Sequence, residues 1–291
     1  MASLAELVRD YLKGEDYVIK AGESFAAIAN RHGMTEQLLW NYEGGTDKKN
    51  SDRIAGSKPS AANKDEVIRV PKLSDSITAT KAEIALPSDM TTSMERLFEK
   101  SIAMQNKTIC VAPGVDSEFN LIHMDQKALE HGGTCSWILA SKKLGIFRTG
   151  AGTAGTFSAD TSRTAGHYIL GDFHTHPYTR FTDGDDNADC AFSGADIRVT
   201  IGWTVFFDMV QSGKTVYLCM RTKKTPRDSA SNAENDYDAE FSSVRNAQRA
   251  AKKRLTRETF QEACYKAAER TCTDYHLAFY AGRGSKLKKR N

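Results

Sequence analysis

The sequence has no long apolar run and carries little excess charge of either sign. No stretch of about 18 apolar residues occurs, so we expect no membrane-spanning helix. The net charge of +3 is too small to indicate a nucleic-acid partner, and the basic C-terminal SKLKKRN is expected to be a solvated tail. The start, MASLAELVRDYLKGEDY, lacks the regions of a signal peptide. Export from the cytoplasm would therefore require a specialised secretion apparatus.

Paired cysteine motifs are also missing. The six cysteines occur without any C-x-x-C spacing, which argues against a cysteine zinc site and against a dense disulfide framework. We expect most of them to be buried thiols. They are Cys110, Cys135, Cys190, Cys219, Cys264 and Cys272.

Three polar stretches interrupt the chain, at 44–66, 72–83 and 223–240. Each combines turn-forming and charged residues without an apolar period, so each is expected to be a loop or linker. The resulting division is an N-terminal helix (1–16), a small module (17–71), a linker (72–88) and a larger domain (89–291) with a helical extension at about 241–275.

The small module has the pattern strand, helix, helix, strand. Its opening YVIKAGESF alternates like a short strand and turns at Gly22. Ser24 and Thr35 are suitable N-caps for the helices FAAIANRHG and EQLLWNYE, and Gly33 is a natural stop between them. VIRVP then forms the closing strand.

These residues resemble a LysM module over about 55 positions. The family binds N-acetylglucosamine chains of peptidoglycan or chitin. The resemblance implies a ligand surface on Gly22, Glu23, Ser24 and Phe25 and on the loop before Val67. The polar insert after Asn41 is longer than usual, and use of the fold only for docking onto another protein remains an alternative.

The larger domain mixes helices and strands. An amphipathic helix is expected over 89–106, followed by strand-like runs TCSWILAS, LGIFRTG, GHYILGDFHTH, VTIGWTVFFDMV, KTVYLCMRT and HLAFYAG. Helical propensity dominates about 241–275. The fold class is therefore α+β, with a mixed sheet flanked by helices.

GDFHTHP predicts a metal site where a strand ends. His174 and His176 project to the same face because strand side chains alternate, and Pro177 cannot continue the ladder. Downstream, FSGADI places Ser193 as an N-cap and Asp196 one helical turn later. Two imidazoles and one carboxylate are a typical open zinc set, with a water in the fourth position. Zinc lowers the pKa of that water to about 7, and a further carboxylate must take its proton.

HTHP followed by S-x-x-D resembles the signature of the JAB/JAMM (MPN) metallopeptidases, most closely their polymorphic-toxin and secretion-effector branch. The resemblance covers roughly residues 90–222. It implies Zn²⁺ ligands at His174, His176 and Asp196, an acid/base at Glu130, and stabilisation of the tetrahedral intermediate by Ser193.

The gap between the second histidine and the serine is longer than is usual in that family. This acidic insert, 177–192, must loop out if the metal set is to assemble. Asp183, Asp185, Asn187 and Asp189 alternate as in a calcium loop, but its required glycine and glutamate are missing, so a solvated loop is expected.

Together the two resemblances predict a zinc-dependent peptidase or isopeptidase that a LysM module targets to peptidoglycan. Such an enzyme would be an antibacterial effector or toxin, delivered by a secretion apparatus and paired with an immunity protein. Two alternatives remain: a JAMM-type toxin that cleaves a protein in the target cytosol, and a non-enzymatic baseplate or adaptor protein with a degenerate site.

Overall fold

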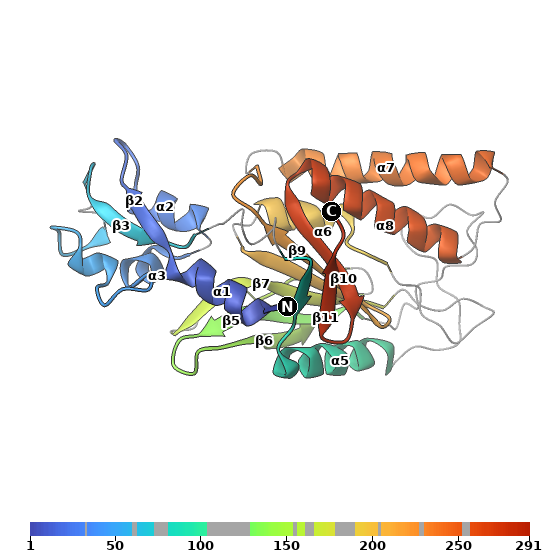
Figure 1. Cartoon of the computed structure of the whole chain (residues 1–291), viewed down its shortest axis with the longest axis horizontal. Coiled ribbons are helices and arrows are strands. Elements are labelled where there is room, and N and C mark those ends of the chain that lie inside the picture. The colour runs from blue at the N-terminus through green and yellow to red at the C-terminus, as the bar shows by residue number, and fades with distance from the viewer. Residues whose placement is uncertain are drawn as a thin grey trace.

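The computed structural model describes residues 1–32, 34–59, 63–72, 81–103, 129–153, 156–160, 166–177, 190–202, 205–226, 230–251 and 257–291. Its largest element is a mixed nine-stranded sheet with the order β1-β4-β11-β10-β9-β8-β7-β5-β6 (Figure 1). Only the β1–β4 and β7–β8 pairs are parallel. The strands are β1 (Ala2–Ser3), β4 (Glu83–Ala85), β5 (His131–Ile138), β6 (Lys143–Ala151), β7 (His167–His176), β8 (Phe207–Ser212), β9 (Thr215–Arg221), β10 (Leu277–Arg283) and β11 (Lys286–Lys289).

Helices cover both faces of this sheet. On one face, α1 (Leu4–Lys13) and α5 (Ser88–Ala103) enclose a core that includes Met209 of β8. On the other, α6 (Gly194–Gly202), α7 (Ala230–Ala250) and α8 (Arg257–Asp274) enclose a core that includes the next residue, Val210. This alternation follows from the two-residue period of a strand. Figure 1 shows α7 and α8 together on the side away from α5.

The small module has the predicted order of elements. They are β2 (Glu15–Val18), α2 (Phe25–Arg31), α3 (Glu36–Trp40), a 3₁₀ turn (Asn50–Asp52) and β3 (Val67–Val70), with β2 and β3 antiparallel. Both predicted N-caps are confirmed, because Ser24 Oγ accepts from Ala27 N and Thr35 Oγ1 accepts from Leu38 N. Gly33 lies outside the described residues.

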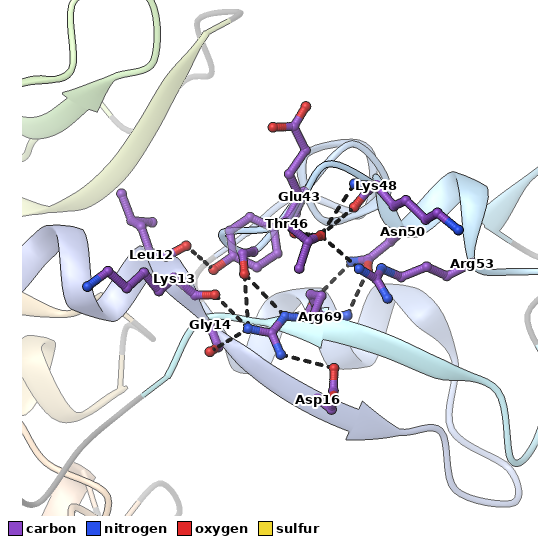
Figure 2. Close-up of polar contacts among 12 residues, drawn as sticks. Leu12, Lys13, Gly14, Asp16, Glu43, Thr46, Lys48, Asn50, Arg53 and Arg69 are labelled. Carbon is purple, nitrogen blue, oxygen red and sulfur yellow. Dashed lines mark hydrogen bonds and ion pairs between the residues drawn. The ribbon is translucent and has the colours of Figure 1, made fainter.

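Helix α1 joins the small module to the sheet. At its C-terminal end, the Arg69 guanidinium donates to the carbonyl oxygens of Lys13 and Gly14, both at 2.8 Å, and to Asp16 at 3.0 Å (Figure 2). Tyr42 Oη donates to the carbonyl oxygen of Leu12 at 2.6 Å. These bonds satisfy carbonyl groups that a helix end leaves without partners.

Aromatic contacts continue this junction into the sheet. Tyr11 stacks on Phe206 with ring centroids 4.3 Å apart, and Tyr42 meets the edge of Tyr168 at 5.9 Å. One hydrophobic core therefore runs through both parts of the chain. The first residues of the predicted N-terminal helix instead form β1, which pairs with β4.

Three local predictions were wrong. The stretch 223–240 is not all loop, because α7 begins at Ala230 and buries Ala233 and Tyr237, four residues apart on one helical face. The strand-like run VTIGWTVFFDMV begins inside α6, and its strand starts only at β8. The basic C-terminal segment contains β11, which buries Leu287 between β10 and β4 while its lysines stay outside the core.

Other predictions agree with the structure as far as it describes the chain. The expected helix over 89–106 is α5, and α7 and α8 account for the helical region at 241–275. The five described cysteines are free and buried, whereas Cys110 lies outside the described residues. No described helix combines the length and apolar character that crossing a membrane requires. The predicted linker 72–88 is only partly a linker, because its residues Glu83–Ala85 form β4, which pairs with β1 and β11. Residues 73–80 of the linker and 178–189 of the acidic insert, including the four calcium-loop positions, lie outside the described residues.

Candidate metal centre

The C-terminal end of β7 carries two buried imidazoles on one face of the sheet. His174 and His176 are 5% and 3% exposed. Opposite His174, the neighbouring strand β5 has Gly132, and the ring of Phe157 packs over this pair, 6.3 Å from the His174 ring. A Cβ on Gly132 would lie 2.6 Å from Phe157, so only glycine leaves room for the aromatic cover.

Three residues with ligand atoms converge at this point, and one ligand atom from each lies within 4.8 Å of the other two. The Nε2 atoms of His174 and His176 are 3.2 Å apart. Asp196 Oδ1 lies 3.3 Å from the first, and Asp196 Oδ2 lies 3.4 Å from the second. Ligands about 2.05 Å from a tetrahedral zinc ion are about 3.3–3.4 Å from one another. The predicted ligand residues are thus brought together closely enough to form a possible metal site, although residues 177–195 separate His176 from Asp196 in the sequence.

The start of α6 fixes the carboxylate of Asp196. Ser193 Oγ accepts from Asp196 N at 3.2 Å, and Ser193 N donates to Asp196 Oδ2 at 2.7 Å, which is a reciprocal capping box. Ser193 Oγ also donates to that oxygen at 2.8 Å. The predicted cap is therefore confirmed. In this arrangement the hydroxyl supports the carboxylate, and its predicted role toward an oxyanion stays a prediction.

Glu130 is buried at the start of β5, only 2% exposed. Its backbone pairs with the far end of β6, where its N–H donates to Thr153 O and its carbonyl oxygen accepts from Gly152 N. It precedes Gly132, the partner of His174, by two residues, so its side chain leaves the chain on the histidine face. Its charge contributes to raising the pKa of His174.

The cluster shifts the pKa values of its own members. Burial alone would lower the pKa of His174, but the negative charge of Asp196 and their hydrogen bond raise it to about 9. Burial would raise the pKa of Asp196, but His174 and His176 hold it well below its usual range. Without a metal, the site is therefore held together as an ion pair between His174 and Asp196.

A second buried carboxylate pair lies next to His174. Asp172 is on the same face of β7 two residues earlier, and Asp208 comes from the adjacent position of β8. Burial, the charge of Asp172 and a hydrogen bond with it raise the pKa of Asp208 well above its usual range. Asp208 also accepts from Met209 N at 2.8 Å and from Thr200 Oγ1 at 3.4 Å.

Sequence reasoning missed both aspartates. A signal for Asp172 existed, since it extends the alternation of His174 and His176 along one strand face. Asp208 stands in the apolar run VFFDMV, where a lone carboxylate is unusual and indicates a site.

The glycan-binding residues predicted in the small module are largely occupied within it. Glu23 accepts from Tyr17 Oη, Lys20 N and Arg31. Ser24 caps α2, and Phe25 is 3% exposed against Trp40. Gly22, with a φ of +78°, has open space around it. Sugar contacts at this turn would therefore fall on Gly22 and on backbone groups.

Comparison with known proteins adds no family assignment: no protein-family model, no curated protein and no solved structure matches the chain significantly. Functional inference therefore depends on the geometry and chemistry of its own residues.

Proposed function

We propose that the chain is a zinc-dependent hydrolase of amide or isopeptide bonds. The observation that carries this proposal is the convergence of two imidazole nitrogens and one carboxylate, at separations of 3.2–3.4 Å. A buried glutamate two residues before Gly132, the partner of His174, supports it. Neutral imidazoles and a carboxylate are ligands that zinc prefers, and three of them leave one position open for chemistry. The described residues fit the ion.

His174, His176 and Asp196 would hold the zinc ion, and Ser193 would keep the Asp196 carboxylate in place through the capping box. When bound, zinc supplies polarisation of a carbonyl group and a lowered pKa for water. Glu130, buried on the same face, would take the proton from the attacking water and pass it to the leaving amine. Phe157 would shield the reacting groups from bulk water.

The substrate we propose is a peptide cross-link of peptidoglycan, reached through a LysM-like module. The shared core between that module and the sheet supports it, because a fixed module presents both surfaces in one orientation. Release by a secretion apparatus and neutralisation by an immunity protein belong to the same proposal. Cleavage of a protein in the target cytosol is the competing outcome, and sedimentation of the chain with purified peptidoglycan distinguishes the two.

The test combines metal content with hydrolysis. We expect about one zinc per chain in the wild type and in Glu130→Gln, and much less in His174→Ala, because only the last removes a ligand. Release of new amines from cross-linked peptidoglycan fragments should be lost in both variants. Glu36→Gln, an exposed position in α3, is the matched control and should behave like the wild type.

Two results would overturn the proposal. One is the absence of zinc at near-stoichiometric level, which would favour a non-enzymatic adaptor protein. The other is hydrolysis that persists in both Glu130→Gln and His174→Ala.

A further inference from the structure

A cavity of about 500 Å³ lies on the face of the sheet opposite the metal centre. Gln211 of β8 lines it and pairs with Thr175, whereas the neighbours Val210 and Ser212 pair with the two histidines. Paired residues of adjacent strands share a face, so cavity and histidines lie on opposite sides. The volume is within the range of small-ligand sites, about 300–1,000 Å³.

One wall of the cavity is a stripe of α5 and the other is formed by two hairpin turns. Met94, Phe98 and Ile102 recur at four-residue spacing and supply apolar surface. Across from them lie the β8–β9 turn, with Val216 beyond it, and the β10–β11 turn. Figure 1 shows α5 beside the β10–β11 hairpin. The walls are thus mainly apolar and come from segments far apart in the sequence.

Four charged side chains line the same cavity and are not paired with each other. Glu95 and Glu99 stand on α5, and Lys214 and Arg283 stand in the two turns. None of the four forms an ion pair within the part of the chain that the structure describes, although both signs face one space. The cavity therefore has acidic side chains on α5 and basic side chains on the opposite wall, with the apolar residues of α5 exposed to the same space.

Gln211 adds a buried polar group to the wall. It is 6% exposed, and its Nε2 donates to Gly213 O at 3.3 Å. Its Oε1 has no hydrogen-bond donor among the described residues. Buried polar groups nearly always have a partner, so the wall lacks one donor that a ligand N–H could supply.

We propose that this cavity binds a short apolar peptide with free termini. The ammonium group of the peptide would lie toward Glu95 and Glu99, and its carboxylate would lie toward Lys214 and Arg283. Its side chains would pack on the apolar surface of α5 around Phe98. A ligand with opposite charges at its two ends is the chemistry that satisfies both sides at once. The proposal does not rest on the metal centre, because the two sites use opposite faces of the sheet.

The experiment measures binding of leucyl-leucine to the full chain by isothermal titration calorimetry. We expect saturable binding of one dipeptide per chain. The N-acetylated and the C-amidated dipeptides should each bind at least about tenfold more weakly, because each loses one charge. The double variants Glu95→Gln/Glu99→Gln and Lys214→Gln/Arg283→Gln change exposed side chains, so folding should be retained. The first should no longer discriminate against N-acetylation and the second against amidation.

Two controls separate this site from the rest of the molecule. Lys286→Gln, an exposed lysine of β11, and Glu36→Gln, an exposed position in α3, do not line the cavity and should both bind leucyl-leucine as the wild type does. Absence of binding to the wild type would overturn the proposal. Equal affinity for the charged and the blocked dipeptides, or binding unchanged in both double variants, would overturn it as well.

Discussion

Two polar clusters of this chain, one around Arg69 and one around His174, differ in how their charged groups find partners. The Arg69 guanidinium makes five hydrogen bonds, to three carbonyl groups and the Asp16 carboxylate, and its backbone pairs with the buried Asn50 (Figure 2). In the His174 cluster, Nδ1 of His174 has no partner among the described residues, and burial together with the charge of Asp172 raises the pKa of Asp208 well above its usual range.

The difference separates a cluster whose polar groups bind one another from a cluster with unused ligand atoms. A fully satisfied network fixes one conformation and leaves nothing for a ligand. Shifted pKa values and unused ligand atoms are features that functional sites often have. Charge removal should therefore have opposite effects on stability at the two places.

The largest effect is expected for Asp196→Asn. Zinc affinity should fall about a thousandfold, equivalent to about 4 kcal/mol, because the ion loses its one anionic ligand. In the metal-free protein the pKa of His174 should fall from about 9, since Asp196 is the group that raises it against burial. Competition titration with a chelating dye and NMR titration of the histidine ring protons measure the two quantities. Asp10→Asn, an exposed aspartate of α1, should change neither.

If the zinc affinity of Asp196→Asn equals that of the wild type, the ion does not bind at this cluster. The asparagine keeps an oxygen that can accept from Ser193 N, so a fall in zinc affinity could not be attributed to loss of the helix cap.

Arg69→Ala should destabilise the protein by about 2 kcal/mol, because three carbonyl groups lose their donor, two of them through part-buried bonds. The exposed Asp16 carboxylate can bind water instead. Urea denaturation measures the change. Zinc affinity should be unaffected, since Arg69 holds the junction between α1 and the small module. Arg53→Ala, which removes a single bond to Thr46, is the control and should cost less than about 1 kcal/mol. Equal losses in the two variants would mean that the Arg69 network does not act as a unit.

Local features of the sequence predicted the parts of the fold that local physics determines. The caps at Ser24, Thr35 and Ser193 each depend on residues three positions apart, and the shared face of His174 and His176 depends on strand alternation alone. Glu130 was placed only through a family resemblance, because no local rule connects it to β7.

The elements that the sequence did not predict depend on contacts between residues far apart in the chain. Strand β11 is a run of lysines around Leu287, and only its place between β10 and β4 makes it a strand. The start of α7 is polar except at Ala230, Ala233 and Tyr237, which pack in one core with residues of α6 and α8. Asp208 acquires its unusual environment from Asp172 on another strand. In each case the deciding contact lies far away in sequence.

Asp208→Asn should cause the smallest change in the free energy of unfolding. The change should be opposite in sign to that of Arg69→Ala, because the variant should stabilise the metal-free protein. The pKa of Asp208 is raised on folding, so the folded state holds a proton that the unfolded state releases above a pH of about 4. The stability that this group contributes is complete below that pH and is lost as the pH rises toward the folded pKa. Asparagine resembles the protonated acid and removes this loss, so the variant should be more stable by about 1 kcal/mol at pH 7 and equal to the wild type near pH 4. Asp89→Asn, an exposed position in α5, is the control. A variant that is less stable than the wild type at pH 7 would show that Asp208 is ionised and satisfied, as Arg69 is, and would remove the difference between the two clusters.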